Sequence, residues 1–100
     1  MKIYKININS IDMDDNMFVI TSTDNTKFIS NINKGSVSFL VYNEDDDEVN
    51  LNNLVVGINV KIIGLKNKEN IIIKKIYIKN NYMLQLDESE SENIDGVDFN

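Results

Sequence analysis

The sequence lacks cysteine, histidine, proline, tryptophan and arginine altogether. Without cysteine, the chain has no disulfide framework, no thiolate nucleophile and no thiolate ligand for a metal. Without histidine, it has no imidazole base, which excludes Ser/His/Asp and Cys/His nucleophilic systems. Without arginine, any grip on phosphate groups falls to lysine, which acts as a point charge. These absences predict a protein that is not an enzyme and that holds no metal or cofactor.

Isoleucine and asparagine dominate what is present, with 16 and 17 residues in a chain of 100. Together with ten lysines and no arginine, this composition resembles that of proteins from large DNA viruses and some protists, whose AT-rich genomes favour these codons. The resemblance concerns origin and carries no chemistry. Isoleucine, valine and phenylalanine favour the pleated surface of strands, so the composition also predicts an all-β fold.

Apolar and polar residues alternate along most of the chain, which is the period expected of strands. The pattern begins at once, with Tyr4, Ile6 and Ile8 on one face. Asparagine, aspartate and glycine at the breaks are typical of turns. We expect strands over residues 2–11, 17–23, 27–32, 60–65 and 70–79, a further strand that turns Val37, Phe39 and Val41 inward, and burial of Ile71, Ile72 and Ile73 on both faces of the last strand.

The charges of the chain are unevenly distributed. Residues 44–48 are all acidic, and like-charge repulsion predicts a solvated loop there. Residues 1–56 carry four lysines against nine acids, whereas residues 57–82 carry six lysines against one acid. We therefore expect a polarised domain, with an acidic end centred on the loop and a basic end centred on the last hairpin.

The periodic pattern stops at Asp87. Residues 87–100 contain six acidic groups and no lysine, which equals the formal net charge of −6. This composition predicts a barrel domain over residues 1–86 and a disordered acidic tail over residues 87–100. With Asp95, Asp98 and Phe99 near its end, the tail resembles the acidic tips of single-strand-binding proteins. That resemblance implies a role in recruiting partners or in modulating access to a basic groove, and a solubilising tail is the alternative.

One spacing resembles the second half of an OB-fold: Leu51-x-x-Leu54-x-x-Gly57-x-x-Val60-x-Ile62-x-Gly64. In that fold a short helix precedes the fourth strand and a hairpin closes the barrel. The resemblance implies a small antiparallel β-barrel of five or six strands, with the leucines in a helical turn at its bottom and Val60 and Ile62 inward. The sequence offers six strands where the OB-fold has five. Either residues 17–23 and 27–32 form one bent pair, or the fold is another small barrel or sandwich.

The candidate binding surface lies on the last strand and the strand predicted beside it. It consists of Lys61, Lys74, Lys75, Tyr77 and Lys79. Lysines that follow phosphates, with an aromatic ring for base stacking, are how OB-folds hold single strands, and each stacked base contributes about 1–3 kcal/mol. The alternative is a solvated strand face that lysine protects from edge-to-edge aggregation.

Two functions are consistent with this pattern. The first is a non-catalytic OB-like domain that binds single-stranded nucleic acid. The alternative is an acidic protein-interaction or assembly subunit of a larger complex, viral if the chain is viral, without nucleic-acid contact. Because no apolar stretch approaches the ~20 residues that span a bilayer and no signal-peptide pattern is present, we expect a soluble intracellular protein without membrane contact. It would act in the cytoplasm or, if viral, in a viral factory or virion.

Overall fold

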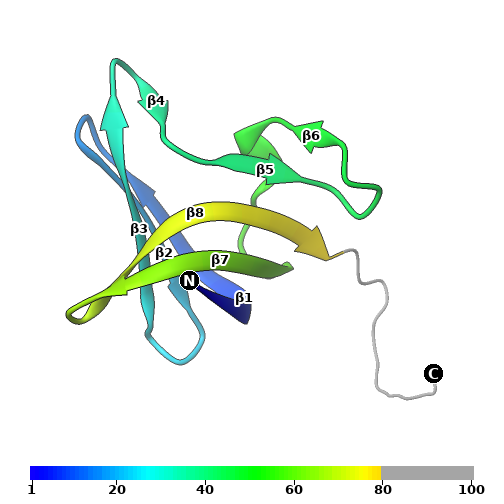
Figure 1. Cartoon of the computed structure of the whole chain (residues 1–100), viewed down its shortest axis with the longest axis horizontal. Helices are drawn as coiled ribbons and strands as arrows, with labels where there is room; N and C mark the ends of the chain where they lie inside the picture. Colours follow the sequence, from blue (N-terminus) through cyan, green and yellow to red (C-terminus); the bar gives the residue numbers. More distant parts are fainter. Residues whose placement is uncertain (80–100) are drawn as a thin grey trace.

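The computed structural model describes residues 1–79, most of which lie in strands joined by tight turns (Figure 1). The elements are β1 (Lys2–Met13), β2 (Met17–Ser22), β3 (Lys27–Asn33), β4 (Ser36–Val37), β5 (Leu40–Tyr42), β6 (Glu48–Val49), the 3₁₀ turn η1 (Leu51–Asn53), β7 (Asn59–Asn67) and β8 (Asn70–Lys79). The predicted all-β fold class is confirmed. The predicted acidic tail, with Asp95, Asp98 and Phe99, lies outside the described residues, as does the end of the predicted domain beyond Lys79.

Five strands close into a ring in the order β1, β2, β3, β8, β7 and back to β1. Neighbours in the ring are antiparallel, except for the parallel pair of β3 and β8. That pair joins Phe28 to Ile71 and Ile29 to Ile72. Strand β1 is long enough to serve two partners, since its first half pairs with β7 and its second half with β2. The ring confirms the predicted small β-barrel.

The short strands β4, β5 and β6 form an arm outside the ring (Figure 1). Strand β5 lies parallel to β8, and β6 pairs antiparallel with β5 on its other side. This arrangement explains why the sequence predicts six strands where the OB-fold has five. Residues 17–23 and 27–32 form two separate strands of the ring, so the sixth predicted strand belongs to the arm.

The arm corrects two expectations. The predicted strand through Val37 and Val41 is broken at Phe39, which is buried and whose ring centroid lies 5.4 Å from that of Phe18. The backbone at Ser38 and Phe39 leaves the hydrogen-bonded sheet, and the Phe39 ring lies in the core. The backbone N–H of Ser38 donates to Ser30 Oγ and not to a backbone oxygen of a neighbouring strand. The predicted acidic loop also ends earlier than expected, because Glu48 lies in β6 opposite Tyr42.

Large aliphatic and aromatic residues fill the ring. The buried core consists of Ile8, Phe18, Ile20, Phe28, Phe39, Val41, Leu54, Val60, Ile62, Ile71, Ile73 and Ile76. Val60 and Ile62 point inward as predicted, and burial of each such side chain contributes about 1.5–3 kcal/mol. Leu51 and Leu54 lie at the predicted helical turn and pack on the core. The expected burial of Ile72 is wrong, because its side chain is half-buried on the outside of the ring.

Two features of β7 and β8 bend these strands around the core. The ladder shifts register between Ile63 and Gly64, so that β8 carries one extra residue, Lys74, in a bulge. At the same place Gly64 allows the strands to approach closely. A Cβ added there would lie 2.5 Å from Ile71 Cγ2 and 3.0 Å from the backbone oxygen of Ile72.

We predict that Gly64→Ala lowers the free energy of unfolding by about 1–3 kcal/mol, because the extra methyl overlaps Ile71 Cγ2 and presses on the backbone oxygen of Ile72. Chemical denaturation measures the change. Val56→Ala, at a side chain that is 61% exposed, is the control and should change stability by less than about 0.5 kcal/mol. Equal stabilities of the two variants would contradict the close approach.

We predict that Tyr4→Phe leaves the unfolding free energy unchanged or raises it by up to about 1–3 kcal/mol. The Tyr4 hydroxyl is buried without a hydrogen-bond partner, while its ring packs edge-on against Phe28 at 5.4 Å. Removing an unsatisfied hydroxyl removes a desolvation cost and keeps the ring contact. A loss of more than about 1 kcal/mol in denaturation would mean that the hydroxyl bonds to a group such as an internal water.

Candidate functional site

A row of basic and aromatic side chains crosses the outer side of the sheet from β1 to β5. Lys5 is paired with Lys61, Lys61 with Tyr77, and Tyr77 with Tyr42. The row faces outward because the next residues on β7 and β8, Ile62 and Ile76, are fully buried and alternate residues of a strand point to opposite sides. We call this row, together with Lys75, the lysine–tyrosine face.

The side chains of this face contact one another closely. The rings of Tyr42 and Tyr77 stack, with centroids 5.4 Å apart and an interplanar angle of 27°. Lys61 Nζ lies 5.6 Å from the Tyr77 centroid, and Lys75 Nζ lies 5.3 Å from that of Tyr42 and 5.8 Å from that of Tyr77. Each such cation–π contact contributes about 0.5–1 kcal/mol at an exposed site. The two rings and two ammonium groups therefore form one cluster.

The bulge in β8 increases the number of lysines on the outer side. Ile73 and Ile76 are both buried, and between them stand two consecutive lysines instead of one. Lys74 is exposed and Lys75 is half-buried. Lys79 ends β8 opposite Asn59 and is also exposed. Of the predicted site residues, the structure brings Lys61, Lys75 and Tyr77 into contact and places Lys74 and Lys79 beside them.

Tyr42 was missed by the sequence analysis. The inward position of Val41 already predicts that Tyr42 points outward, because neighbouring residues of a strand face opposite sides. Its place beside Tyr77 depends on the parallel pairing of a three-residue strand with β8, for which the local sequence carries no signal. Lys5 was likewise missed as a neighbour of Lys61.

A groove of about 340 Å³ opens beside Tyr77. Strands β1, β7 and β8 contribute Lys61, Lys79, Tyr77 and three isoleucines, Ile3, Ile63 and Ile78. The turn between β5 and β6 contributes Asn43, Glu44 and Asp46. The groove thus joins ammonium groups, an aromatic ring and carboxylates around an apolar surface.

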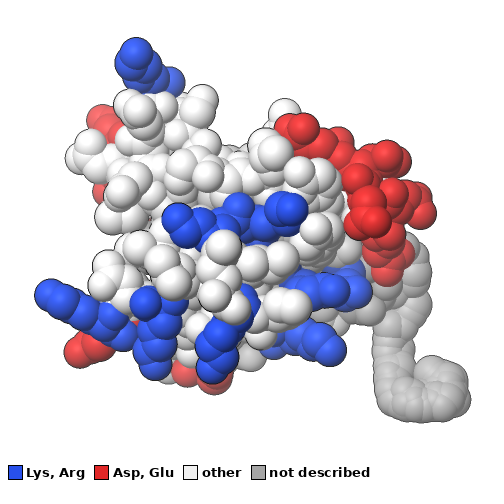
Figure 2. Space-filling view, viewed as in Figure 1, with Lys and Arg blue, Asp and Glu red and all other residues white. Residues whose placement is uncertain are grey.

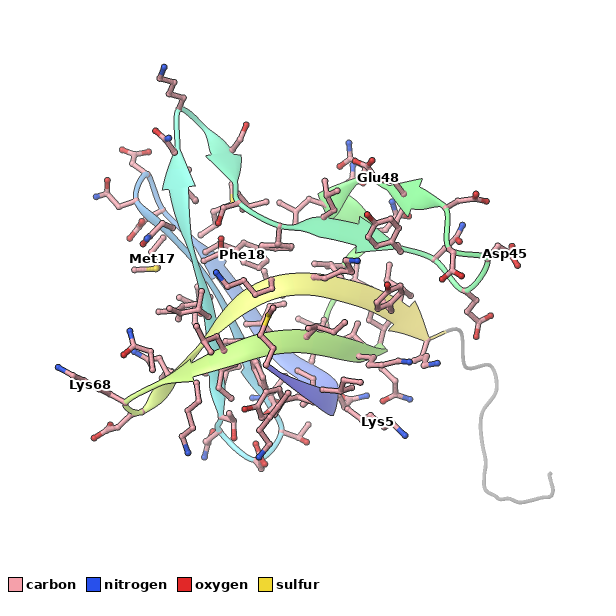
Figure 3. All side chains as sticks on the ribbon, in the orientation of Figure 1. Lys5, Met17, Phe18, Asp45, Glu48 and Lys68 are labelled. Carbon is pink, nitrogen blue, oxygen red and sulfur yellow. The ribbon has the colours of Figure 1, made fainter. Side chains whose placement is uncertain are left out.

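The distribution of charge differs from a simple division into two ends. Lysines gather over β7 and β8, and carboxylates gather at one end over the β5–β6 turn (Figure 2). Lys68, at the tip of the last hairpin, and Asp45 lie at opposite ends of the molecule, as predicted (Figure 3). The acidic turn nevertheless borders Lys61 and Lys79 across the groove, because β5 is held beside β8.

The acidic turn has a defined backbone. The Asn43 side-chain oxygen accepts hydrogen bonds from the backbone N–H groups of Asp45 and Asp47, at 2.8 and 3.0 Å. The backbone N–H of Asn43 donates to the Asp47 carbonyl oxygen at 2.9 Å, and Asp46 has a φ of 64°. Asparagine and aspartate tolerate this left-handed conformation better than most residues. The turn is therefore a formed structure with a fixed backbone conformation.

Asp14 and Asp24, which lie outside the acidic turn, have lowered pKa values because their carboxyl groups accept hydrogen bonds within turns of the fold. The backbone N–H groups of Asn16 and Met17 donate to Asp14 and lower its pKa. The Ser22 hydroxyl and then Thr26 lower the pKa of Asp24. Such groups stabilise the fold above the unfolded-state pKa, and this stabilisation is lost as pH falls through the lowered folded-state value. Both residues lie in turns of the ring, away from the lysine–tyrosine face.

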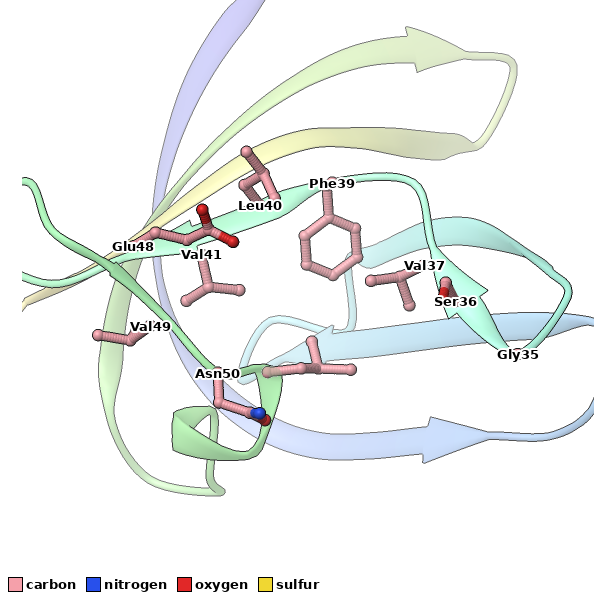
Figure 4. A pocket seen from close by; sticks show the side chains of 10 residues that line it. Gly35, Ser36, Val37, Phe39, Leu40, Val41, Glu48, Val49 and Asn50 are labelled. Atoms are coloured by element: carbon pink, nitrogen blue, oxygen red, sulfur yellow. The ribbon is translucent and has the colours of Figure 1, made fainter.

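A second cavity, of about 290 Å³, lies within the arm (Figure 4). Val37, Phe39 and Val41 point into it, and Glu48 is the one ionisable residue in its lining. A single carboxylate offers no pair of ionisable groups for acid–base work. Within residues 1–79, no group of three or more acidic, histidine or cysteine side chains is placed to hold a metal ion. No helix in this part of the chain is long and apolar enough to cross a membrane.

We predict that a double-mutant cycle on Tyr42→Ala and Tyr77→Ala gives a coupling free energy of about 0.5–1.5 kcal/mol in chemical denaturation, because the rings stack. The control cycle combines Tyr42→Ala with Tyr4→Ala. Tyr4 packs on Phe28 instead, so these two effects should add within about 0.3–0.5 kcal/mol. Additive effects of Tyr42 and Tyr77 would contradict the stacked pair.

Comparisons with known proteins place the chain in no family. No family model, no curated protein sequence and no solved structure matches it. A functional reading therefore rests on the topology and the side-chain geometry of the residues described above.

Proposed function

We propose that this chain is a non-catalytic OB-fold-like domain that binds single-stranded nucleic acid on its lysine–tyrosine face. The observation that carries the proposal is the cluster of Lys61, Lys75, Tyr42 and Tyr77 on the outside of β5, β7 and β8. Ammonium groups attract phosphates without regard to sequence, and aromatic rings stack on any base. A surface that combines both fits a flexible single strand better than a rigid duplex.

The order of the strands supports the OB-fold part of the proposal. An OB-fold is a five-stranded Greek-key barrel, and the ring here has five strands. The short turn η1 precedes β7, the fourth strand of the ring, and the hairpin of β7 and β8 completes the closure through β3. The arm of β4 to β6 is inserted between the third and fourth strands of the ring.

The proposed surface differs from the usual OB-fold site. That site uses the face of the second and third strands together with the loops after the first and fourth strands. In this chain the middle of the outer side of β2 and β3 carries Val19 and Ile29, with Lys27 at the start of β3, whereas the turn after the fourth strand of the ring carries Lys68. We therefore propose that the bound nucleic acid crosses β7, β8 and β5. In this proposal the acidic segment 87–100 competes with nucleic acid for the lysines or recruits a protein partner.

One observation favours a second candidate function, protein–protein assembly without nucleic-acid contact. Four aliphatic residues, Val19, Ile29, Ile72 and Leu65, are register partners in a row across β2, β3, β8 and β7. On the outer side of a sheet that faces water, polar residues usually occupy such positions. An apolar row of this kind fits the surface of another protein subunit, and its binding would depend little on salt.

We predict that the full chain binds fluorescently labelled single-stranded DNA or RNA at low salt and that its affinity falls steeply as salt rises. Tyr77→Ala should weaken binding about fivefold or more, because it removes a stacking ring. Lys61→Gln should weaken binding and reduce the salt slope by about one. Fluorescence anisotropy titrations at several salt concentrations measure all three effects.

The control is Lys27→Gln, which removes the same charge from an exposed position at the start of β3. It should change affinity less than Lys61→Gln does. If neither DNA nor RNA binds at tens of micromolar while the chain self-associates independently of salt, the nucleic-acid proposal is wrong and the assembly function takes its place.

A further inference from the structure

The groove beside Tyr77 has two chemically different sides. Lys61 and Lys79 on the ring can approach phosphates, whereas the carboxylates of Glu44 and Asp46 on the acidic turn repel them. A single-stranded nucleic acid whose phosphates contact these lysines must therefore turn another part of a nucleotide toward Asp46. The sugar and the base remain, and only the base has a flat face that can stack on Tyr77, which lines the same groove and has its other ring face on Tyr42.

The carboxylate of Asp46 limits which bases fit. An ionised carboxylate only accepts hydrogen bonds, so it pairs with exocyclic amino groups such as cytosine N4 and adenine N6. Thymine and uracil present a carbonyl oxygen at the position equivalent to cytosine N4. The single donor of thymine and uracil on this edge, N3–H, lies between two carbonyl oxygens that the carboxylate repels, so these bases contact Asp46 less favourably.

The turn is suited to this role because its conformation is already fixed. Two hydrogen bonds to the Asn43 side chain and the left-handed backbone at Asp46 hold the turn without a ligand. A preformed acceptor loses little freedom when a base binds. The same backbone allows a sharp test, since asparagine adopts the left-handed conformation as readily as aspartate.

We propose that this groove holds one base of the bound strand and selects bases with an exocyclic amino group, cytosine, adenine or guanine, over thymine and uracil. The inference rests on the proposed function, since it assigns a base preference to the same surface. Asp46 is the residue that sets the preference, and Tyr77 stacks on the selected base. Lys61 and Lys79 hold the flanking phosphates.

The test compares the affinity of the full chain for oligo(dC) and oligo(dT) of about ten nucleotides, a length within the range of OB-fold site sizes. Anisotropy titrations at pH 7.5 and one fixed salt concentration should give at least about fivefold tighter binding of oligo(dC), the lower end of what one base contact supplies. Asp46→Asn should reduce this ratio to below about twofold, because the amide can also donate to the thymine carbonyl.

Asp47→Asn is the matched control. It removes the same charge from the same turn, but Asp47 does not line the groove. Both variants should raise the affinity for oligo(dT) through weaker repulsion, and only Asp46→Asn should change the ratio. Thermal denaturation confirms that both variants fold. Binding without preference, or a preference that survives Asp46→Asn, overturns this inference alone. No binding of either oligonucleotide by the wild-type chain overturns the proposed function itself, and this inference with it.

Discussion

The pairing of β8 with three strands is the constraint on which the other features depend. Its first half closes the ring against β3 through the pairs at Ile71 and Ile72, and its second half holds β5 through the pairs from Lys75 to Tyr77, while β7 pairs along its whole length. The bulge at Lys74 separates the two halves and lets one strand bend between two partners. Without the pairing to β5, Tyr42 would have no fixed neighbour, and the acidic turn would not border the lysines.

Charge and packing cooperate on the outer face. Lysine ammonium groups over tyrosine rings keep an aromatic surface partly covered in the absence of a ligand, which limits association between exposed apolar faces. The acidic turn reduces the attraction of the same lysines for anions in general. The face is therefore suited to a ligand that offers both negative charge and flat rings. The single-stranded nucleic acid that we propose as the ligand offers both, whereas a simple anion offers only charge.

Much of the fold was predictable because local rules determine it. Alternation placed the long strands and the inward direction of Val60 and Ile62, and the spacing of Leu51 and Leu54 predicted the helical turn. The arm was not predictable, because the break at Phe39 follows from its contact with Phe18, which lies 21 residues earlier in the chain. For the site, alternation placed Lys75 and Tyr77 on one side of β8. The contact with Tyr42 and the groove depend on the parallel pairing of β5, which no local pattern predicts.

We propose that nucleic acid binds on the outer side of β5, β7 and β8. The most direct measurement is a titration of the ¹⁵N-labelled chain with a single-stranded oligonucleotide, followed by amide chemical shifts in NMR spectra. The account predicts that the largest shift changes gather at Lys61, Lys75, Tyr77, Tyr42 and the adjoining acidic turn. Shift changes centred on Val19 and Ile29 of β2 and β3, or no changes at all, would contradict it.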